Sequence, residues 1–199
     1  MNYEEMRAEL SRRLKKSRFD HSLGVAETSA ALARRFGEDE TRARVAGLLH
    51  DCAREFPNEA MLGEAESRGL DVDEVERSST LLLHAPLGAL RAREVYGIED
   101  EAVCRAITLH TVGARDMTAL DKIVYFADMI EPTRAYPGVE ALRELAREAT
   151  LDEMTLAGLT RSIMFVLEKG GLVHPDTVLA RNGLLLARAR EAKGAGHDE

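Results

Sequence analysis

The sequence has little of what membrane, secreted or disordered proteins contain. Its two cysteines, Cys52 and Cys104, lie in helical patterns without CxxC spacing, which argues against a disulfide or zinc knuckle and indicates reduced, buried thiols. Only five prolines accompany 45% hydrophobic residues, which is not typical of a disordered chain. No run approaches the roughly 20 apolar residues that cross a bilayer, and the charged N-terminal stretch lacks the apolar core of a signal peptide. We therefore expect a cytoplasmic protein without a membrane partner.

An excess of positive charge is also missing. The formal net charge is -8, whereas nonspecific binding of nucleic acid needs a basic surface that displaces counterions from phosphates. We therefore expect no nucleic-acid partner, while local arginines still allow a small anionic substrate. With 199 residues and no linker or composition shift, the chain predicts one domain over residues 1–192, followed by a small, polar, disordered tail over residues 193–199.

Strand signals are scarce, and helical periodicity recurs almost everywhere. Alternating patterns and hairpin turns between β-branched runs are missing, so we expect an all-α fold. Glycine and proline mark several helix ends, because glycine favours the residue after a helix and proline its first turn. The expected helices are 25–36 with a stop at Gly37, one from near Thr41, a short one in 57–71 with a stop at Gly69, 86–97, 100–111, 118–130, 139–149, 151–168 and one from Pro175.

The stretch RARVAGLLHDCAREF, residues 42–56, carries a histidine and an aspartate side by side within a helical pattern. Its apolar stripe, which faces a core, consists of Val45, Leu48, Leu49 and Cys52. His50 and Asp51 lie on the other side, together with the small residues Ala43, Ala46 and Gly47. Because a solvated helix face would carry Lys and Glu, this pattern predicts that another element packs closely there.

More polar side chains stand at inward-facing helix ends: His21, His84, His110 and Asp128. Taken singly, each is explained by a core histidine bonded to a backbone carbonyl or by a carboxylate paired with arginine. Taken together with His50 and Asp51, they form a set of imidazoles and carboxylates that suits a transition metal. His197 in the tail and His174 before a proline do not share this setting.

The order of these residues resembles the metal-binding pattern of the HD-domain phosphohydrolases. The surrounding segments resemble more narrowly the YqeK-type branch, the symmetrical diadenosine tetraphosphate hydrolases. The segments that carry the resemblance are RFDHSLGVAETSAALA, AGLLHDCARE, LLLHAPLGA, AITLHTVG, DKIVYFADMIEPTR and GLVHPDTVLARN, from about Ser17 to Asn182. The resemblance implies an all-helical HD-domain bundle, one or two divalent metal ions, most simply iron with manganese as an alternative, and cleavage of the substrate into two nucleoside diphosphates.

The resemblance also assigns roles to individual residues. The primary metal ligands are His21, His50, Asp51 and Asp128, while His84 and His110 match the pair that holds a second metal. Asp51 is placed to bridge two ions, so we expect Asp51, His84 and His110 to be catalytic. His21 is expected to contact the substrate as well.

The remaining candidates would bind the substrate. Arginine forks suit polyphosphate oxygens better than lysine, which favours Arg18, Arg54 and Arg134 close to the expected ligands, although each could be an ordinary surface arginine. Thr111 follows His110 and would either bond a phosphate or cap its helix. The loop KGGLVHP, residues 169–175, would bring Gly170, Gly171 and His174 near a nucleotide, or would simply end one helix and start the next.

Two other functions fit parts of this pattern. One is an HD phosphohydrolase that acts on a nucleoside monophosphate, a deoxynucleotide triphosphate or a cyclic dinucleotide. The other is a metal- or nucleotide-binding regulator without turnover. For the tetraphosphatase, the expected partners are the dinucleotide substrate, ADP- or GDP-like products and a second copy of the chain in a homodimer.

Overall fold

The computed structural model describes the backbone of residues 1–194 and the side chains of residues 1–190. Within this range all regular elements are helices and no strand occurs, so the predicted all-α fold is confirmed. The α-helices are α1 (Tyr3–Arg13), α2 (Lys16–Phe36), α3 (Glu40–Leu49), α4 (Met61–Ser67), α5 (Glu74–Ser78), α6 (His84–Tyr96), α7 (Glu101–Leu109), α8 (Ala119–Ile130), α9 (Val139–Glu148), α10 (Leu151–Glu168) and α11 (Pro175–Gly194). Three short 3₁₀ helices, Cys52–Glu55, Asn58–Ala60 and Thr80–Leu83, lie in the connections.

Most predicted helix ends agree with the structure because their capping residues act as expected. Gly37 and Gly97 adopt left-handed φ angles of 74° and 68° after α2 and α6. Thr150 and Glu153 form a capping box at the start of α10. The helix α11 continues to Gly194, beyond the expected domain boundary at residue 192. The rest of the expected tail, with His197, lies outside the described residues.

The expected continuous helix over residues 42–56 is wrong. The helix α3 ends at Leu49, and His50 follows as its C-cap. Asp51 has φ −105° and ψ 16°, and a 3₁₀ helix begins at Cys52. A tighter 3₁₀ turn replaces the α-helix at this point, so His50 and Asp51 point their side chains from a helix end rather than from the middle of one rigid helix.

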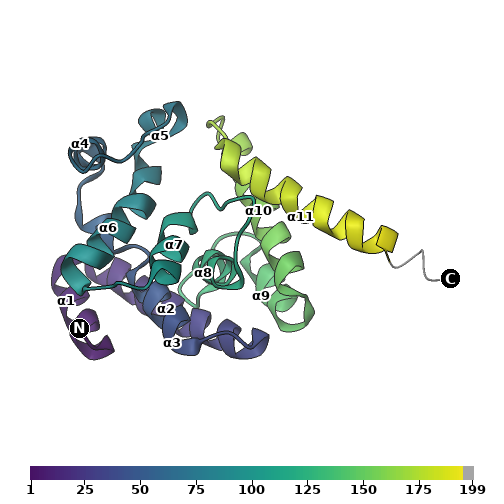
Figure 1. The fold of residues 1–199 in the computed structure, drawn as a ribbon, viewed down its shortest axis with the longest axis horizontal. Coiled ribbons are helices and arrows are strands. Elements are labelled where there is room, and N and C mark those ends of the chain that lie inside the picture. The colour runs from purple at the N-terminus through teal and green to yellow at the C-terminus, as the bar shows by residue number, and fades with distance from the viewer. Residues whose placement is uncertain (195–199) are drawn as a thin grey trace.

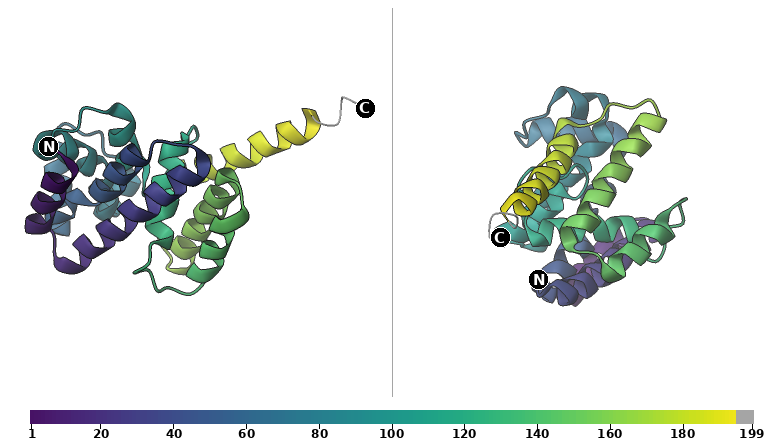
Figure 2. Two further views of the ribbon diagram at one scale, coloured as in Figure 1. Left: turned by 90° about the horizontal axis from the view of Figure 1, so that it is seen from below. Right: turned by 90° about the vertical axis from the view of Figure 1, so that its right-hand side faces the viewer.

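The helices form a central group that other helices flank on both sides (Figure 1). In this group α2 packs against α3 and α8, and α7 packs against α3, α6 and α8. On the C-terminal side of this central group, α10 contacts α8, α9 and α11, and α11 extends away from the other helices (Figure 2). No helix within residues 1–194 is long and apolar enough to cross a membrane.

The predicted close packing beside His50 and Asp51 is present between α2 and α3. A Cβ atom at Gly47 would lie 2.9 Å from both the Ala26 Cα atom and the Val25 carbonyl oxygen. Ala43 and Ala46 on the same side are fully buried. Glycine and alanine therefore let the two helix backbones approach, which brings His50 next to residues of α2.

Candidate metal centre and active site

The six side chains that the sequence predicts as metal ligands come together where five helices meet. His21 projects from α2 and Asp128 from α8, while His84 is the first residue of α6. His50 and His110 directly follow α3 and α7, and Asp51 comes next to His50. All except the partly buried Asp128 are buried. These helix ends thus gather four imidazoles and two carboxylates around one point.

Asp51 lies between two groups of donor atoms. In the first group the His21 Nε2 atom is 3.0 Å from the Asp128 Oδ1 atom, 3.2 Å from the His50 Nε2 atom and 3.8 Å from the Asp51 Oδ2 atom. In the second group the Asp51 Oδ1 atom is 3.3 Å from the His84 Nε2 atom and 4.0 Å from the His110 Nε2 atom. The two oxygens of one carboxylate therefore face different pairs of imidazoles, which is the geometry that a bridging ligand needs.

Backbone carbonyls fix the orientation of three of these imidazole rings. The His50 and His110 Nδ1 atoms each lie 2.7 Å from the carbonyl oxygen three residues earlier, those of Gly47 and Ile107. His84 bonds the Leu81 carbonyl oxygen in the same way. Because a carbonyl oxygen only accepts, each Nδ1 atom carries the proton and each Nε2 atom points its lone pair into the cluster.

This donor set fits a divalent metal. The His84 and His110 Nε2 atoms are only 3.0 Å apart, although neither has a proton to share, so their lone pairs repel each other unless a cation lies nearby. The combination of imidazole nitrogens with carboxylate oxygens is typical of divalent transition metals. The fixed Nδ1 protons supply the outer hydrogen bonds that metal-bound histidines usually make.

The electrostatics of the second group favour the protonation states that bind a metal, whereas in the first group the carboxylates of Asp51 and Asp128 outweigh burial and raise the pKa of His50. Burial, with the neighbouring imidazoles, lowers the pKa of His110 to about 3 and also lowers that of His84. Burial opposes the charge of Asp51, but the neighbouring imidazoles, His50 foremost, outweigh it and hold the pKa of this carboxyl well below its usual range. At neutral pH the second group therefore offers neutral imidazoles and an ionised carboxylate.

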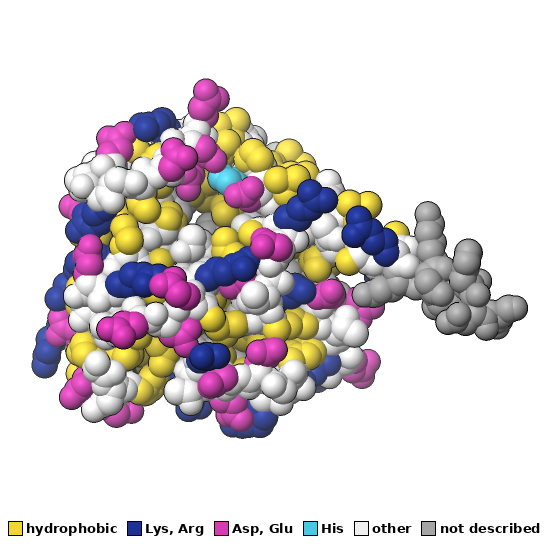
Figure 3. Space-filling model, in the orientation of Figure 1, with side chains coloured by type: hydrophobic (Ala, Val, Ile, Leu, Met, Phe, Trp, Pro, Cys, Tyr) yellow, Lys and Arg dark blue, Asp and Glu magenta, His cyan; other side chains and the backbone are white. Residues whose placement is uncertain are grey.

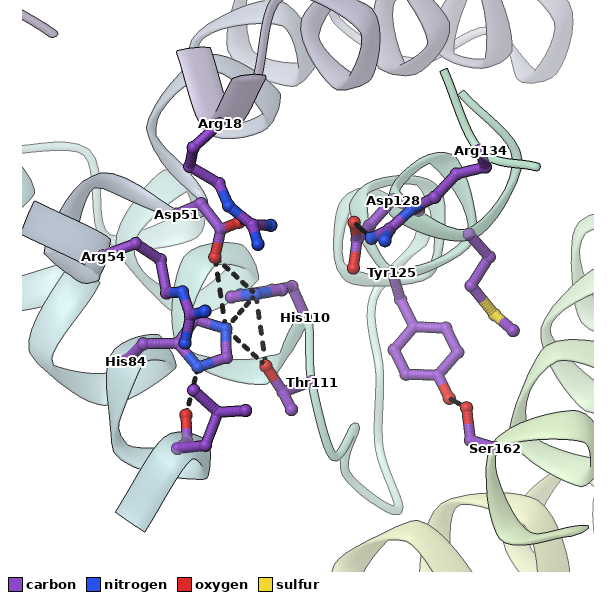
Figure 4. Close-up of a pocket in the computed structure, with 12 residues that line it drawn as sticks. Arg18, Asp51, Arg54, His84, His110, Thr111, Tyr125, Asp128, Arg134 and Ser162 are labelled. Atoms are coloured by element: carbon purple, nitrogen blue, oxygen red, sulfur yellow. Dashed lines mark hydrogen bonds and ion pairs between the residues drawn. The ribbon is translucent and has the colours of Figure 1, made fainter. Parts of the chain in front are cut away.

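Three predicted arginines line a cavity of about 210 Å³ that opens beside the cluster (Figure 4). Arg18 donates to the Asp51 Oδ2 atom over 2.7 Å, and Arg134 donates to the carbonyl oxygen and the carboxylate of Asp128. Arg54 differs, because its buried Nη1 atom has no hydrogen-bond partner among the described residues. A guanidinium nitrogen that is buried without a partner has free N–H donors for an anion in the cavity.

Thr111 points its hydroxyl group toward the second pair of histidines. Its Oγ1 atom lies 3.1 Å from the His110 Nε2 atom and 3.3 Å from the His84 Nε2 atom. The hydroxyl also lines the cavity beside the arginines. The C-cap of α7 is His110 and not Thr111, while the contact of Thr111 with a phosphate stays a prediction.

The structure does not bring the predicted loop residues to the metal cluster. The His174 Nε2 atom donates to the Asp73 Oδ2 atom over 2.9 Å, and its Nδ1 atom accepts from the Asp176 backbone N–H over 3.2 Å. Its ring lines a larger cavity that adjoins the metal site. Gly170, with φ 67°, and Gly171 are absent from the residues that line either cavity.

One functional side chain was missed by the sequence reasoning. Glu131 is fully buried, and its Oε1 atom accepts from the His21 Nδ1 atom over 2.9 Å, which turns the His21 Nε2 atom toward the cluster. Thr133 donates its backbone N–H to the same carboxylate over 2.7 Å. Gly24 leaves the space that the Glu131 carboxylate occupies. The signal was in the spacing, since Glu131 comes one helical turn after Asp128 and Gly24 comes one turn after His21.

Comparison with known proteins agrees with this geometry. The family model described as "HD domain" matches residues 18–133, more than half of the chain. The symmetrical bis(5'-nucleosyl)-tetraphosphatase of Bacillus subtilis (strain 168) is 37% identical over 93% of this chain and 98% of its own, and that of Halalkalibacterium halodurans is 39% identical over 87% and 91%. A crystal structure of a predicted HD superfamily hydrolase involved in NAD metabolism, from Clostridium acetobutylicum, has a TM-score of 0.89 and 39% identity, and the match covers 94% of this chain and 98% of that one. The chain therefore belongs to the HD domain family, in the group of the symmetrical bis(5'-nucleosyl)-tetraphosphatases.

Proposed function

We propose that this protein is a metal-dependent hydrolase that cleaves diadenosine tetraphosphate symmetrically into two molecules of ADP. The observation that carries the proposal is the cluster of all six predicted ligands, with three arginines beside it. The relatives with the same domain over most of their length bear this activity in their names. The substrate class is inferred from the similarity to these relatives, and the cluster of predicted ligands supports metal-dependent hydrolysis.

A bound divalent cation lowers the pKa of its water toward neutrality and neutralises charge on a phosphoryl oxygen. His21, His50, Asp51 and Asp128 would hold one ion, and Asp51, His84 and His110 a second one. In this arrangement Asp51 would contribute to holding both ions, because its two oxygens face the two groups of imidazoles. Iron is our proposal for the metal, with manganese as the alternative, because imidazole and carboxylate ligands suit both.

The arginines would orient the polyphosphate chain and balance its charge. Arg54 has the free donors, so it is the strongest candidate for a direct contact with a phosphoryl oxygen. Arg18 and Arg134 are paired with the carboxylates of Asp51 and Asp128, and their remaining N–H groups face the same cavity. The Thr111 hydroxyl would donate to a phosphoryl oxygen next to the second metal position.

Location and assembly complete the proposal. We expect the enzyme to act in the cytoplasm, where the nucleotide is soluble, and to form a homodimer. His174 would contact the nucleotide from the adjoining cavity, with Gly170 and Gly171 giving its loop the turn that it needs.

The test is hydrolysis of diadenosine tetraphosphate by purified protein loaded with iron or manganese, with the products separated by ion-exchange chromatography and the bound metal measured by elemental analysis. ADP as the only product supports the proposal. AMP together with ATP would contradict symmetrical cleavage. Intact substrate in the presence of bound metal would contradict the substrate assignment, and a panel of monophosphates, deoxynucleotide triphosphates and cyclic dinucleotides would then identify the nucleotide.

A further inference from the structure

A second cavity adjoins the metal site and is larger. Its volume is about 680 Å³, against about 210 Å³ for the cavity over the metal ligands. The two share Thr111, Met129, Arg134 and Ser162 as common walls. Sites for small organic ligands usually measure about 300–1,000 Å³, so the larger cavity matches such a ligand while the smaller one suits a phosphoryl group.

The chemistry of the two cavities differs in the same way. The larger cavity lies between the loop after α8 and the end of α10, and its wall is mostly apolar, with the aromatic rings of Tyr136 and Phe165. The charged residues that line it are Arg134, which the metal site shares, Arg161, and the adjacent Glu168 and Lys169 at the end of α10. Aromatic and apolar walls suit the face of a nucleobase, and Arg134, where the two cavities meet, suits the phosphates of a nucleotide.

Polar groups also lie in or beside this cavity. The buried Arg161 Nε atom has no hydrogen-bond partner among the described residues, although the Nη2 atom of the same side chain donates to the Pro137 carbonyl oxygen over 3.1 Å. The hydroxyl groups of Tyr125 and Ser162 bond each other over 2.9 Å where the two cavities meet. A ribose has hydroxyl groups that both donate and accept, so it complements these positions.

The rim of the cavity is exposed and apolar. Apolar side chains lie open to solvent over the upper parts of α10 and α11 (Figure 3). Phe165 and Leu172, which line the cavity, keep 52% and 56% of their surface exposed. Exposed aromatic and aliphatic groups beside a cavity are typical of a ligand site rather than of a closed core.

We infer that this cavity binds one nucleoside of the substrate, with the base against the ring of Phe165 and the phosphates directed past Arg134 to the metal site. The inference rests on the proposed function for the identity of the ligand. It goes beyond that function because it names Phe165 as the residue that binds the base.

The experiment uses tryptophan as a reporter, because the chain contains none. Phe165→Trp keeps an aromatic ring at the rim, and Leu167→Trp is the matched control on the same helix, because Leu167 is 63% exposed but does not line the cavity. Each metal-loaded variant is titrated with ADP and, separately, with inorganic pyrophosphate. We expect ADP to change the fluorescence of Phe165→Trp and pyrophosphate to leave it unchanged, while Leu167→Trp responds to neither.

Phe165→Ala and Leu167→Ala complete the set. Loss of a base–aromatic stack should weaken ADP binding about tenfold in Phe165→Ala, and pyrophosphate binding and metal content should stay the same. Leu167→Ala should match the wild type in all three measurements. Equal affinity of ADP in Phe165→Ala and wild type, or an unmodified protein that binds ADP no better than pyrophosphate, would overturn the inference.

The same measurements distinguish failure of the proposed function from failure of the nucleoside site. If diadenosine tetraphosphate is not hydrolysed but ADP binding still depends on Phe165, the nucleoside site stands and the assigned reaction is wrong. If the tetraphosphate is hydrolysed with the same KM in Phe165→Ala and wild type, the reaction stands and the nucleoside lies elsewhere.

Discussion

The metal cluster and the cavity beside it are built in opposite ways. In the cluster, polar groups are buried and held by backbone carbonyls and by Glu131, so the donor atoms are oriented before anything binds. In the cavity, the walls are apolar, the rim is open and the Arg161 Nε atom lacks a partner among the described residues. A preorganised cluster suits chemistry that is the same for every substrate, whereas an open apolar cavity suits selection among substrates.

Replacing Asp51 by alanine should have the largest effect. This carboxylate reaches both groups of imidazoles, so its loss removes a ligand from each metal position. We expect hydrolysis to fall at least about 1,000-fold, together with the metal content, while the helical signal in circular dichroism is retained. Full activity in a metal-replete Asp51→Ala sample would show that the site assignment is wrong.

Replacing Arg54 by alanine should have the second-largest effect on activity and should leave the metal content unchanged. The Arg54 Nη1 atom has no hydrogen-bond partner among the described residues, so its N–H groups are available to an anion. A charge-assisted hydrogen bond contributes roughly 1.5–3 kcal/mol, so kcat/KM should fall about 10- to 100-fold at unchanged metal content. Arg77→Ala is the control, since Arg77 is exposed, is paired with Glu66 and lines neither cavity. Equal losses of kcat/KM in Arg54→Ala and Arg77→Ala would show that Arg54 does not bind the substrate.

Glu131→Gln tests whether the orientation of His21 matters for metal binding. The glutamine keeps the size of the side chain but loses the charge that holds the His21 Nδ1 proton. Changes in such outer hydrogen bonds typically weaken metal affinity about 10- to 100-fold, and we expect the lower end of this range here. Metal titration and thermal unfolding with and without metal separate this role from a structural one.

The matched control is Glu140→Gln, which changes an exposed carboxylate of α9. A purely structural role of Glu131 would lower the stability of the metal-free protein and leave metal affinity as it was. Unchanged metal affinity in Glu131→Gln would therefore contradict the positioning role.

The sequence predicted the cluster far better than the cavity, and the physical reason lies in what each requires. Buried histidines and aspartates at helix ends are costly, so their pattern is visible without a structure. The cavity forms where α8, α10 and the loop around Tyr136 meet in three dimensions, and no local spacing in the sequence predicts that meeting. An aromatic residue such as Phe165 also looks like an ordinary core position in a helical pattern. Local reasoning also extended the helix through His50, because periodicity does not reveal the turn that the His50 ring makes with the Gly47 carbonyl.

Replacing His174 should have the smallest effect, and it gives the sharpest test of the difference between the metal cluster and the larger cavity. The sequence predicts it as a substrate-binding residue outside the metal ligands, and in the structure it lines the larger cavity and bonds Asp73. His174→Gln should therefore leave metal content and kcat unchanged and raise KM a few-fold, because the ring supports the nucleoside and not the reaction. Asp176→Asn changes the exposed neighbour and should leave KM within twofold of the wild type. If His174→Gln instead lowered the metal content, the cavity and the metal cluster would be one coupled site. That result would contradict the view that the cavity selects the substrate while the cluster carries out the reaction.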